Sequence, residues 1–409
     1  LQWMSQRGNV LISYGIPSGS IKALVTVSIT PNISKLPPLS LYIHIPWCVR
    51  KCPYCDFNSH TTRVIPESLY IDVLIEDLTQ ELANVQGRSL HSIFFGGGTP
   101  SLFSAAGIAR ILTEVERRIS FCRDIEITLE ANPGSAEQHK FSGYSAAGVN
   151  RLSIGVQSFN PVHLSSLGRI HSNTEAIAAA DAARRAGISN FNIDLMHGLP
   201  GQTQPEGLAD IQQAIDLEPT HISWYQLTIE PNTVFYNSPP TLPSDDQLAD
   251  IQDAGDEMLG NAAFSQYEIS AYSRDNQFSK HNTNYWLFGD YIGIGAGAHG
   301  KITDICSQQI VRRWKTRSPK DYLSSDTGLI AGDRQLIAAE LPLEFLMNGL
   351  RLNDGFETDL FTARTGLAWE SMQPKLDQLI QRKLLKHQSG NLRATAAGKR
   401  FLNTILEEF

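Results

Sequence analysis

The stretch LYIHIPWCVRKCPYC (residues 41–55) joins a strand-like run to three closely spaced cysteines. Apolar and β-branched side chains dominate its first seven residues, a composition that predicts a buried β-strand. Cys48, Cys52 and Cys55 follow directly, with C-x3-C-x2-C spacing. The sequence therefore predicts a loop of thiol ligands immediately after the first strand.

Five further strand-like runs follow, and helical patterns fill most of the intervals between them. The runs are SIFFGG (92–97), IEITLEA (125–131), RLSIGVQS (151–158), NFNIDLMH (190–197) and HISWYQLTI (221–229). The helical patterns lie at residues 67–85, 105–119, 173–187 and 204–216. Strands that alternate with helices predict a parallel sheet with right-handed crossovers. Because eight such units close a full barrel, six predict an α/β fold with a partial, open TIM-like (βα)6 barrel.

The pattern along the chain predicts four parts. Residues 1–37 are acid-free, rich in Ser and Thr and without a sustained period, so we expect a poorly ordered extension, with a targeting peptide as the alternative. Residues 38–264 form the barrel, and residues 265–330 form a connecting region that extends the sheet and carries HNTNYW in a loop. Residues 331–409 resemble a small winged-helix-like helical domain.

Charge and cysteine content exclude several classes of protein. The chain has 409 residues and a net charge of −8, and its last part carries as many acidic as basic side chains, so we expect no nucleic-acid partner. No run of about 18 apolar residues occurs, which predicts no transmembrane segment. Five cysteines are an odd number, unlike a secreted disulfide framework, and indicate a reducing, cytoplasmic location.

Three thiols on one tight loop favour an iron–sulfur cluster over zinc, which is the alternative. A structural zinc ion usually takes four protein ligands. Three thiolates instead leave one corner of a cubane 4Fe–4S cluster without a protein ligand. Such an open iron is reactive toward small molecules.

Seven segments, the cysteine loop included, resemble the radical S-adenosylmethionine (SAM) superfamily and, within it, the oxygen-independent coproporphyrinogen III oxidase group. They are SLYIHIPWC, FFGGGTPSLF, LEANPG, GVNRLSIGVQSF, LGRIH, FNIDLMHGLPGQT and YQLTIEPNT, and the resemblance covers residues 38–409. It implies a 4Fe–4S cluster held by Cys48, Cys52 and Cys55. It also implies that the open iron chelates the methionine moiety of SAM, whose reductive cleavage yields a 5′-deoxyadenosyl radical.

Glycine and polar residues at the carboxyl ends of the predicted strands complete this site. Gly97, Gly98 and Thr99 end the second strand, where missing Cβ atoms let backbone groups approach a ligand. Barrel-type sheets place their chemistry at these strand ends. By the resemblance, the residues that contact SAM are Tyr42, Gly97, Gly98, Thr99, Glu130, Gln157, Arg169 and Asp194.

Two features separate this chain from the oxidases of the group. The oxidase pattern continues with a fourth cysteine, C-x3-C-x2-C-x-C, where this chain has Phe57, and residues 281–286 form an H-N-x-x-Y-W block. Both features resemble the HemW-type haem chaperones. The resemblance makes His281 the first candidate to ligate or orient haem iron, with Tyr285 and Trp286 as aromatic surface for the macrocycle. The alternative for His281 is an ordinary hydrogen-bonding loop residue.

We therefore expect a haem-binding chaperone that carries a 4Fe–4S cluster and SAM and transfers haem to apo-haemoprotein acceptors. An electron donor for the cluster and transient contact with membrane proteins are further expected partners. The alternative is an oxygen-independent coproporphyrinogen III oxidase, which converts propionates to vinyls in porphyrin biosynthesis. Phe57 counts against that activity.

Overall fold

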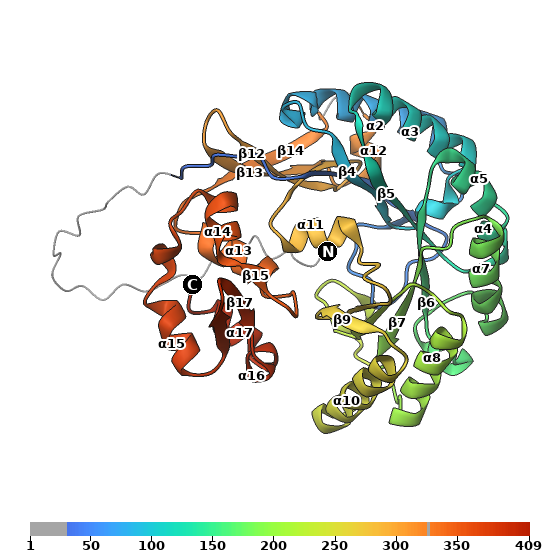
Figure 1. Cartoon of the computed structure of the whole chain (residues 1–409). Helices are drawn as coiled ribbons and strands as arrows, with labels where there is room; N and C mark the ends of the chain where they lie inside the picture. The colour runs from blue at the N-terminus through green and yellow to red at the C-terminus, as the bar shows by residue number, and fades with distance from the viewer. Residues whose placement is uncertain (1–30, 325–327) are drawn as a thin grey trace.

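A computed structural model describes residues 31–324 and 328–409 of the chain. Twelve strands in that part form one sheet, in the order β14-β13-β12-β11-β1-β4-β5-β6-β7-β8-β10-β9. Six adjacent strands of this sheet, all parallel, form the barrel: β1 (Leu39–Ile45), β4 (Leu90–Gly97), β5 (Phe121–Ala131), β6 (Arg151–Gln157), β7 (Phe191–His197) and β8 (His221–Gln226). The edge strands β14 (Ile330–Leu336) and β9 (Ser265–Glu268) do not pair with each other, so the sheet stays open. The predicted α/β fold with a partial barrel is confirmed (Figure 1).

Helices cover the outer face of the parallel strands and return the chain from one strand to the next (Figure 1). The main ones are α2 (Glu67–Gln80), α3 (Ala105–Arg118), α5 (Phe141–Ala147), α7 (Asn173–Arg185), α8 (Gln204–Asp216) and α10 (Asp245–Asn261). Shorter pieces are η2 (Leu82–Val85), η3 (Pro100–Leu102), α4 (Ser135–Gln138), α6 (Pro161–Ser166) and α9 (Val234–Asn237). Side-chain caps fix several of their starts: Ser104 accepts the N–H of Gly107 at α3, and Ser172 forms a capping box with Glu175 at α7.

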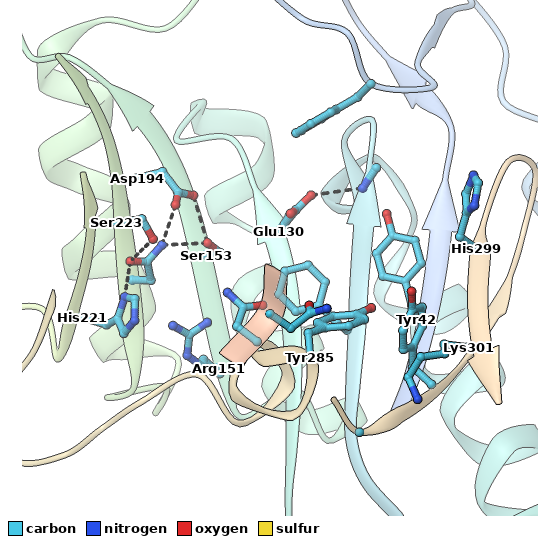
Figure 2. Close-up of a pocket in the computed structure, with 18 of the residues that line it drawn as sticks. Tyr42, Glu130, Arg151, Ser153, Asp194, His221, Ser223, Tyr285, His299 and Lys301 are labelled. Carbon is cyan, nitrogen blue, oxygen red and sulfur yellow. Dashed lines mark hydrogen bonds between the residues drawn. The ribbon is translucent and has the colours of Figure 1, made fainter. Parts of the chain in front are cut away.

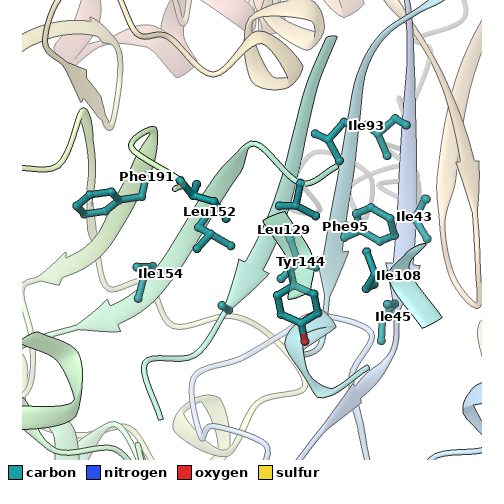
Figure 3. Packing of buried hydrophobic residues seen from close by; sticks show 14 of the residues in the cluster. Ile43, Ile45, Ile93, Phe95, Ile108, Leu129, Tyr144, Leu152, Ile154 and Phe191 are labelled. Atoms are coloured by element: carbon teal, nitrogen blue, oxygen red, sulfur yellow. The ribbon is translucent and has the colours of Figure 1, made fainter. Parts of the chain in front are cut away.

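Alternate residues of the parallel strands form the main hydrophobic core beneath these helices. Ile43, Phe95 and Leu129 are 0% exposed, and Figure 3 shows them beside Ile108 of α3 and Tyr144 of α5. Successive side chains of a strand point to opposite faces. The other residues of the same strands therefore face the inside of the arc, where many of them are polar.

Both edges of the parallel sheet are extended by later parts of the chain. On one side β11 (Asp290–Ile294) pairs in parallel with β1, and β12 (His299–Asp304), β13 (Gln309–Lys315) and β14 follow in antiparallel order. On the other side β10 (Ala271–Ser273) pairs with β8 and β9. The predicted boundary at residue 331 falls inside β14. The short helix α12 (Pro319–Tyr322) follows β13.

The HNTNYW block forms a helix, so its prediction as a loop was wrong. This helix, α11 (Lys280–Trp286), lies inside the arc of strands (Figure 1). Ser279 caps it by accepting the N–H of Asn282, and the carboxylate of Glu126 on β5 accepts the N–H groups of Lys280 and His281, both at 3.1 Å. A carboxylate at a helix N-terminus is stabilising. These tertiary contacts outweigh the low helix propensity of the block.

A second hydrophobic core lies in the C-terminal part of the chain. Its sheet has the order β15-β17-β16, formed by β15 (Phe356–Glu357), β16 (Leu385–Gln388) and β17 (Asn391–Ala394). Its helices are α13 (Leu341–Gly349), α14 (Thr358–Thr365), η4 (Trp369–Met372), α15 (Lys375–Gln381), α16 (Ala396–Arg400) and α17 (Leu402–Leu406). Ile33 is 2% exposed within this core, and Asn32 donates its N–H to the carbonyl of Gly366 at 2.9 Å. This end of the predicted extension is packed, contrary to expectation, whereas residues 1–30 lie outside the described residues.

Candidate cluster and cofactor site

The three cysteines of the loop line one cleft of about 910 Å³ at the carboxyl ends of the parallel strands. Cys48 ends the short strand β2 (Trp47–Cys48), which pairs with β3 (His60–Thr61), and Cys52 and Cys55 follow on the turn. All three thiols are free and half-buried. Burial raises the pKa of Cys48, and raises that of Cys55 to about 11. Binding of iron therefore has to displace protons from these thiols.

The three thiols of the loop do not form a group that could hold a single metal ion. Within residues 31–324 and 328–409, no three His, Cys, Asp or Glu side chains converge as the ligands of one metal ion would. A cubane cluster needs no such convergence, because each thiolate bonds to a different iron atom.

Two glycines bring the end of β4 against the cysteine loop. Gly97 has a φ of 115°, and a Cβ atom there would lie 2.5 Å from the ring of His44. A Cβ atom on Gly98 would lie 2.5 Å from the carbonyl oxygen of Trp47. The N–H groups of Gly98 and Thr99 donate to the carbonyls of Ile45 and Trp47, both at 2.8 Å. Larger residues would push this edge of the cleft away from the thiols.

Two carboxylates stand beside the glycines on the inner face of the sheet. Glu130 is the next-to-last residue of β5 and accepts the N–H of Gly97 at 3.2 Å. Burial raises the pKa of Glu130 to about 8, and the nearby charge of Asp194 adds to this effect. Asp194 on β7 accepts the hydroxyl of Ser153 at 2.9 Å and the amide of Asn192 at 2.7 Å, while burial raises its pKa. A cationic ligand would stabilise the charged form of both groups.

Of the remaining predicted SAM contacts, Arg169 and Gln157 line the same cleft. Arg169 points its Nη1 atom toward the Cys52 Sγ atom at 3.9 Å, and its Nη2 atom donates to the Asn132 side chain at 2.7 Å. Gln157 adopts a φ of 71° and accepts the hydroxyl of Tyr225 at 2.8 Å. Tyr42 lies outside the cleft and lines a second, smaller cavity on the inner face of the sheet. Its hydroxyl and the His44 Nδ1 atom are 3.0 Å apart.

His281 is the one predicted site residue that does not line either cavity of this region. It is 0% exposed, and its ring nitrogens lie 2.9 Å from the Ser92 hydroxyl and 3.0 Å from the Tyr285 hydroxyl. Burial, together with the charge of Arg151, lowers the pKa of His281 to about 3, so the ring is neutral. Its contact with haem stays a prediction. The residues of its block that reach the cavities are Asn282, Tyr285 and Trp286.

Several cavity residues were missed from the sequence. Asn132 and Tyr225 contact Arg169 and Gln157 at the cleft, as described above. In the smaller cavity, polar side chains recur at every second position of β6, β7 and β8. They are Arg151, Ser153, Asn192, His221 and Ser223. This period-2 polar pattern on otherwise apolar strands was the available signal.

The chain is similar to known proteins in sequence and in fold. The Radical SAM superfamily matches residues 42–215, and the HemN C-terminal domain matches residues 336–401. The chain is 50% identical over 380 residues to the heme chaperone HemW of Haemophilus influenzae, covering 92% of this chain and 98% of that protein. The heme chaperone HemW of Escherichia coli is 49% identical over 376 residues, covering 92% and 99%. This chain belongs to the HemW family.

A solved structure supports the fold of this HemW-family chain. Coproporphyrinogen III oxidase (HemN) from E. coli matches 91% of this chain and 90% of its own with a TM-score of 0.77, at 22% sequence identity. At that identity, the likeness concerns the fold. The match to the Radical SAM superfamily and the identity to the two HemW proteins confirm the predicted superfamily and haem-chaperone group.

Membership of the radical SAM superfamily implies a 4Fe–4S cluster and SAM, and the residues at the cleft fit both. Three free thiols share the cleft with the glycine edge, and Arg169 has a buried Nε atom without a hydrogen-bond partner among the described residues. Cys48, Cys52 and Cys55 would hold the cluster, which when bound would supply electrons to SAM. Gly97, Gly98 and Thr99 line the space beside it, and Glu130 and Asp194 offer carboxylates to a cationic ligand.

Proposed function

We propose that this protein binds haem at the cleft and passes it to acceptor proteins, while its cysteine loop holds a 4Fe–4S cluster and SAM. The observation that carries the proposal is the similarity to two proteins named heme chaperone HemW, at 50% and 49% identity over nearly their full lengths. Identity at this level over whole chains favours a shared activity more strongly than the fold alone does.

The size and lining of the cleft support a large, partly apolar ligand beside the cluster and SAM. A volume of about 910 Å³ lies near the upper end of the roughly 300–1,000 Å³ typical of small-molecule sites. Val49, Ile170 and Ile269 are 59%, 65% and 41% exposed at its rim. Deeper in the cleft Trp286 is only 4% exposed, and the Arg351 guanidinium lies 4.2 Å from its ring centroid. The three rim residues offer a macrocycle apolar contacts, whereas the Trp286 ring is buried under Arg351.

Phe57 supports a carrier rather than an oxidase. It stands where the oxidase pattern has its fourth cysteine, is 37% exposed and lines both the cleft and the smaller cavity beneath it. An apolar ring at this position adds contact surface for a macrocycle and supplies no thiol. We therefore assign no coproporphyrinogen oxidase activity to the chain.

The location and the other partners belong to the same proposal. All five cysteines are free, which agrees with a reducing cytoplasm. Among the described residues, no helix has the length and hydropathy needed to cross a bilayer. We infer that acceptor proteins, membrane proteins in transient contact among them, and an electron donor approach the cleft from its open rim.

Within this function His281 acts as a positioning residue for Tyr285. Its neutral ring lies 3.0 Å from the Tyr285 hydroxyl. Tyr285 lines the smaller cavity next to the cleft, whereas His281 does not. Loss of one buried hydrogen bond costs about 1–2 kcal/mol, which corresponds to roughly tenfold in affinity.

Haem titration of the reconstituted protein tests this assignment. The wild type should give a saturable Soret band, and His281→Ala and Tyr285→Phe should each weaken binding about tenfold without moving the band, because the axial ligand is unchanged. The double variant should bind no more weakly than the single ones. His387→Ala, at an exposed position of β16, is the matched control. A shifted band in His281→Ala alone would make His281 an iron ligand, and unchanged binding in both variants would remove the pair from the site.

A further inference from the structure

A smaller chamber of about 180 Å³ lies on the inner face of the sheet, next to the cleft. Seven residues line both cavities, so the two adjoin: Phe57, Gly97, Glu130, Ser153, Asp194, Ser223 and Asn282. One wall of the chamber is formed by inward-facing polar residues of β6, β7 and β8. Figure 2 shows Arg151 on this side, in the space between His221 and Tyr285.

Arg151 is a buried cation whose donors are unused. It is 2% exposed, its Nε atom is buried without a hydrogen-bond partner, and its guanidinium makes no hydrogen bond within the part of the chain that the structure describes. The carboxylate of Glu126 lies 3.9 Å from Nε, but it accepts the N–H groups of Lys280 and His281 instead. A buried charge with unfilled donors is costly unless a ligand satisfies them.

The other cations that line the chamber have close partners, which sets Arg151 apart. Lys301 donates to Asp290 at 2.9 Å, and Arg312 donates to Glu344. Each of these cations is therefore neutralised by the protein itself.

The acceptors of the chamber wall are also occupied. The Asn192 Oδ1 atom accepts from the His221 ring at 2.6 Å and from the Ser223 hydroxyl at 3.0 Å. The two oxygens of Asp194 accept from Ser153 and Asn192 (Figure 2). Among the described residues, none of these acceptors takes a hydrogen bond from the Arg151 guanidinium.

We propose that Arg151 binds a carboxylate of the transported ligand, namely a propionate of haem that reaches from the cleft into the chamber. The inference rests on the proposed function and adds the group that orients the ligand. A guanidinium binds a carboxylate through two parallel, charge-assisted hydrogen bonds, and these are strongest where water is excluded. The chamber holds a side arm, and the adjoining cleft holds the ring.

Esterified haem gives the first test, with the wild-type protein carrying its cluster. Haem dimethyl ester differs from haem at the two propionates, where neutral methyl esters replace the anionic carboxylates. We expect esterification to weaken binding about 10- to 100-fold, as measured by Soret titration. Equal affinity for the two ligands would overturn the proposal without touching haem binding. Failure of the wild type to bind either ligand would instead remove the proposed function, and the inference with it.

Substitution of Arg151 tests whether this residue causes the loss of affinity on esterification. Arg151→Gln should weaken binding of haem by a similar factor while leaving the affinity for the ester unchanged, so the penalty of esterification disappears. Arg151→Lys keeps the charge but not the bidentate geometry, so its affinity for haem should lie between those of the wild type and Arg151→Gln. Arg185→Gln, at an exposed position of α7, is the matched control. If Arg151→Gln does not fold, the proposal is tested by Arg151→Lys and by the comparison of haem with its dimethyl ester in the wild type.

The carboxylate of SAM is the other possible source of such an anion. Equilibrium binding of SAM to wild type and Arg151→Gln separates the two. The proposal expects equal SAM affinity in both proteins. A loss of SAM binding with haem binding unchanged would overturn it, as would a penalty of esterification that persists in Arg151→Gln.

Discussion

Cys52→Ser is expected to abolish the iron–sulfur cluster. Cys52 lies between the other two loop cysteines on the wall of the cleft, and its Sγ atom is 3.9 Å from the Arg169 Nη1 atom. The chain supplies three thiols at this cleft, so removal of one leaves two thiolates for a cluster that needs three. We expect nearly all of the cluster iron and the broad absorbance at roughly 400 nm to disappear after anaerobic reconstitution.

The remaining cysteines provide the controls for that variant. Cys122 and Cys306 are free, and neither lines the cleft. Cys122→Ser and Cys306→Ser should keep the iron and sulfide content of the wild type. A Cys52→Ser protein that retains its cluster would show that the ligands are other residues.

Lys315→Met is expected to destabilise the folded barrel by about 3–5 kcal/mol. The Lys315 ammonium is 1% exposed and lies 2.5 Å from Asp77 and 2.6 Å from Glu81, two carboxylates on or next to α2. Asp77 also accepts the N–H of Gly295 at 3.1 Å and so fixes the turn between β11 and β12. Without Lys315 both carboxylates stay buried with less compensation. Chemical denaturation, read as the free energy of unfolding, measures the loss.

An exposed ion pair is the matched control for Lys315. Arg382 and Glu408 lie 2.8 Å apart with side chains 48% and 40% exposed, so Arg382→Met should change the free energy of unfolding by less than about 1 kcal/mol. Adding Asp77→Asn to Lys315→Met should restore part of the stability by removing one buried charge. A loss in Lys315→Met as small as in Arg382→Met would contradict the structural role of this pair.

The barrel could be predicted from the sequence because each of its strands is a short apolar run with a clear boundary. The run LYIHIPW and its five successors correspond to β1 and β4–β8, with ends displaced by a few residues. By contrast, β11 joins β1 from a position some 250 residues later along the chain, and such a distant pairing has no local pattern. The sequence predicted that residues 265–330 extend the sheet, but the strand that they join required the structure.

The part of the site that lies within recognisable sequence motifs could be predicted. The three cysteines, Gly97, Gly98, Thr99, Glu130, Gln157, Arg169 and Asp194 all line the cleft. The burial of His281 could not be foreseen, because it depends on Ser92 of β4 and on the helix that Glu126 caps. Arg151 was missed for a related reason: a single arginine at the start of a strand resembles a surface residue until the inner face of the sheet is seen.

One anaerobic incubation tests the central claim, that this chain carries haem and does not oxidise coproporphyrinogen. The reconstituted protein, with its cluster content verified, is supplied with coproporphyrinogen III, SAM and a reductant, and the porphyrin products are measured beside a haem titration of the same preparation. We predict saturable haem binding and unconsumed coproporphyrinogen. Conversion of coproporphyrinogen to protoporphyrinogen by this protein would contradict the account.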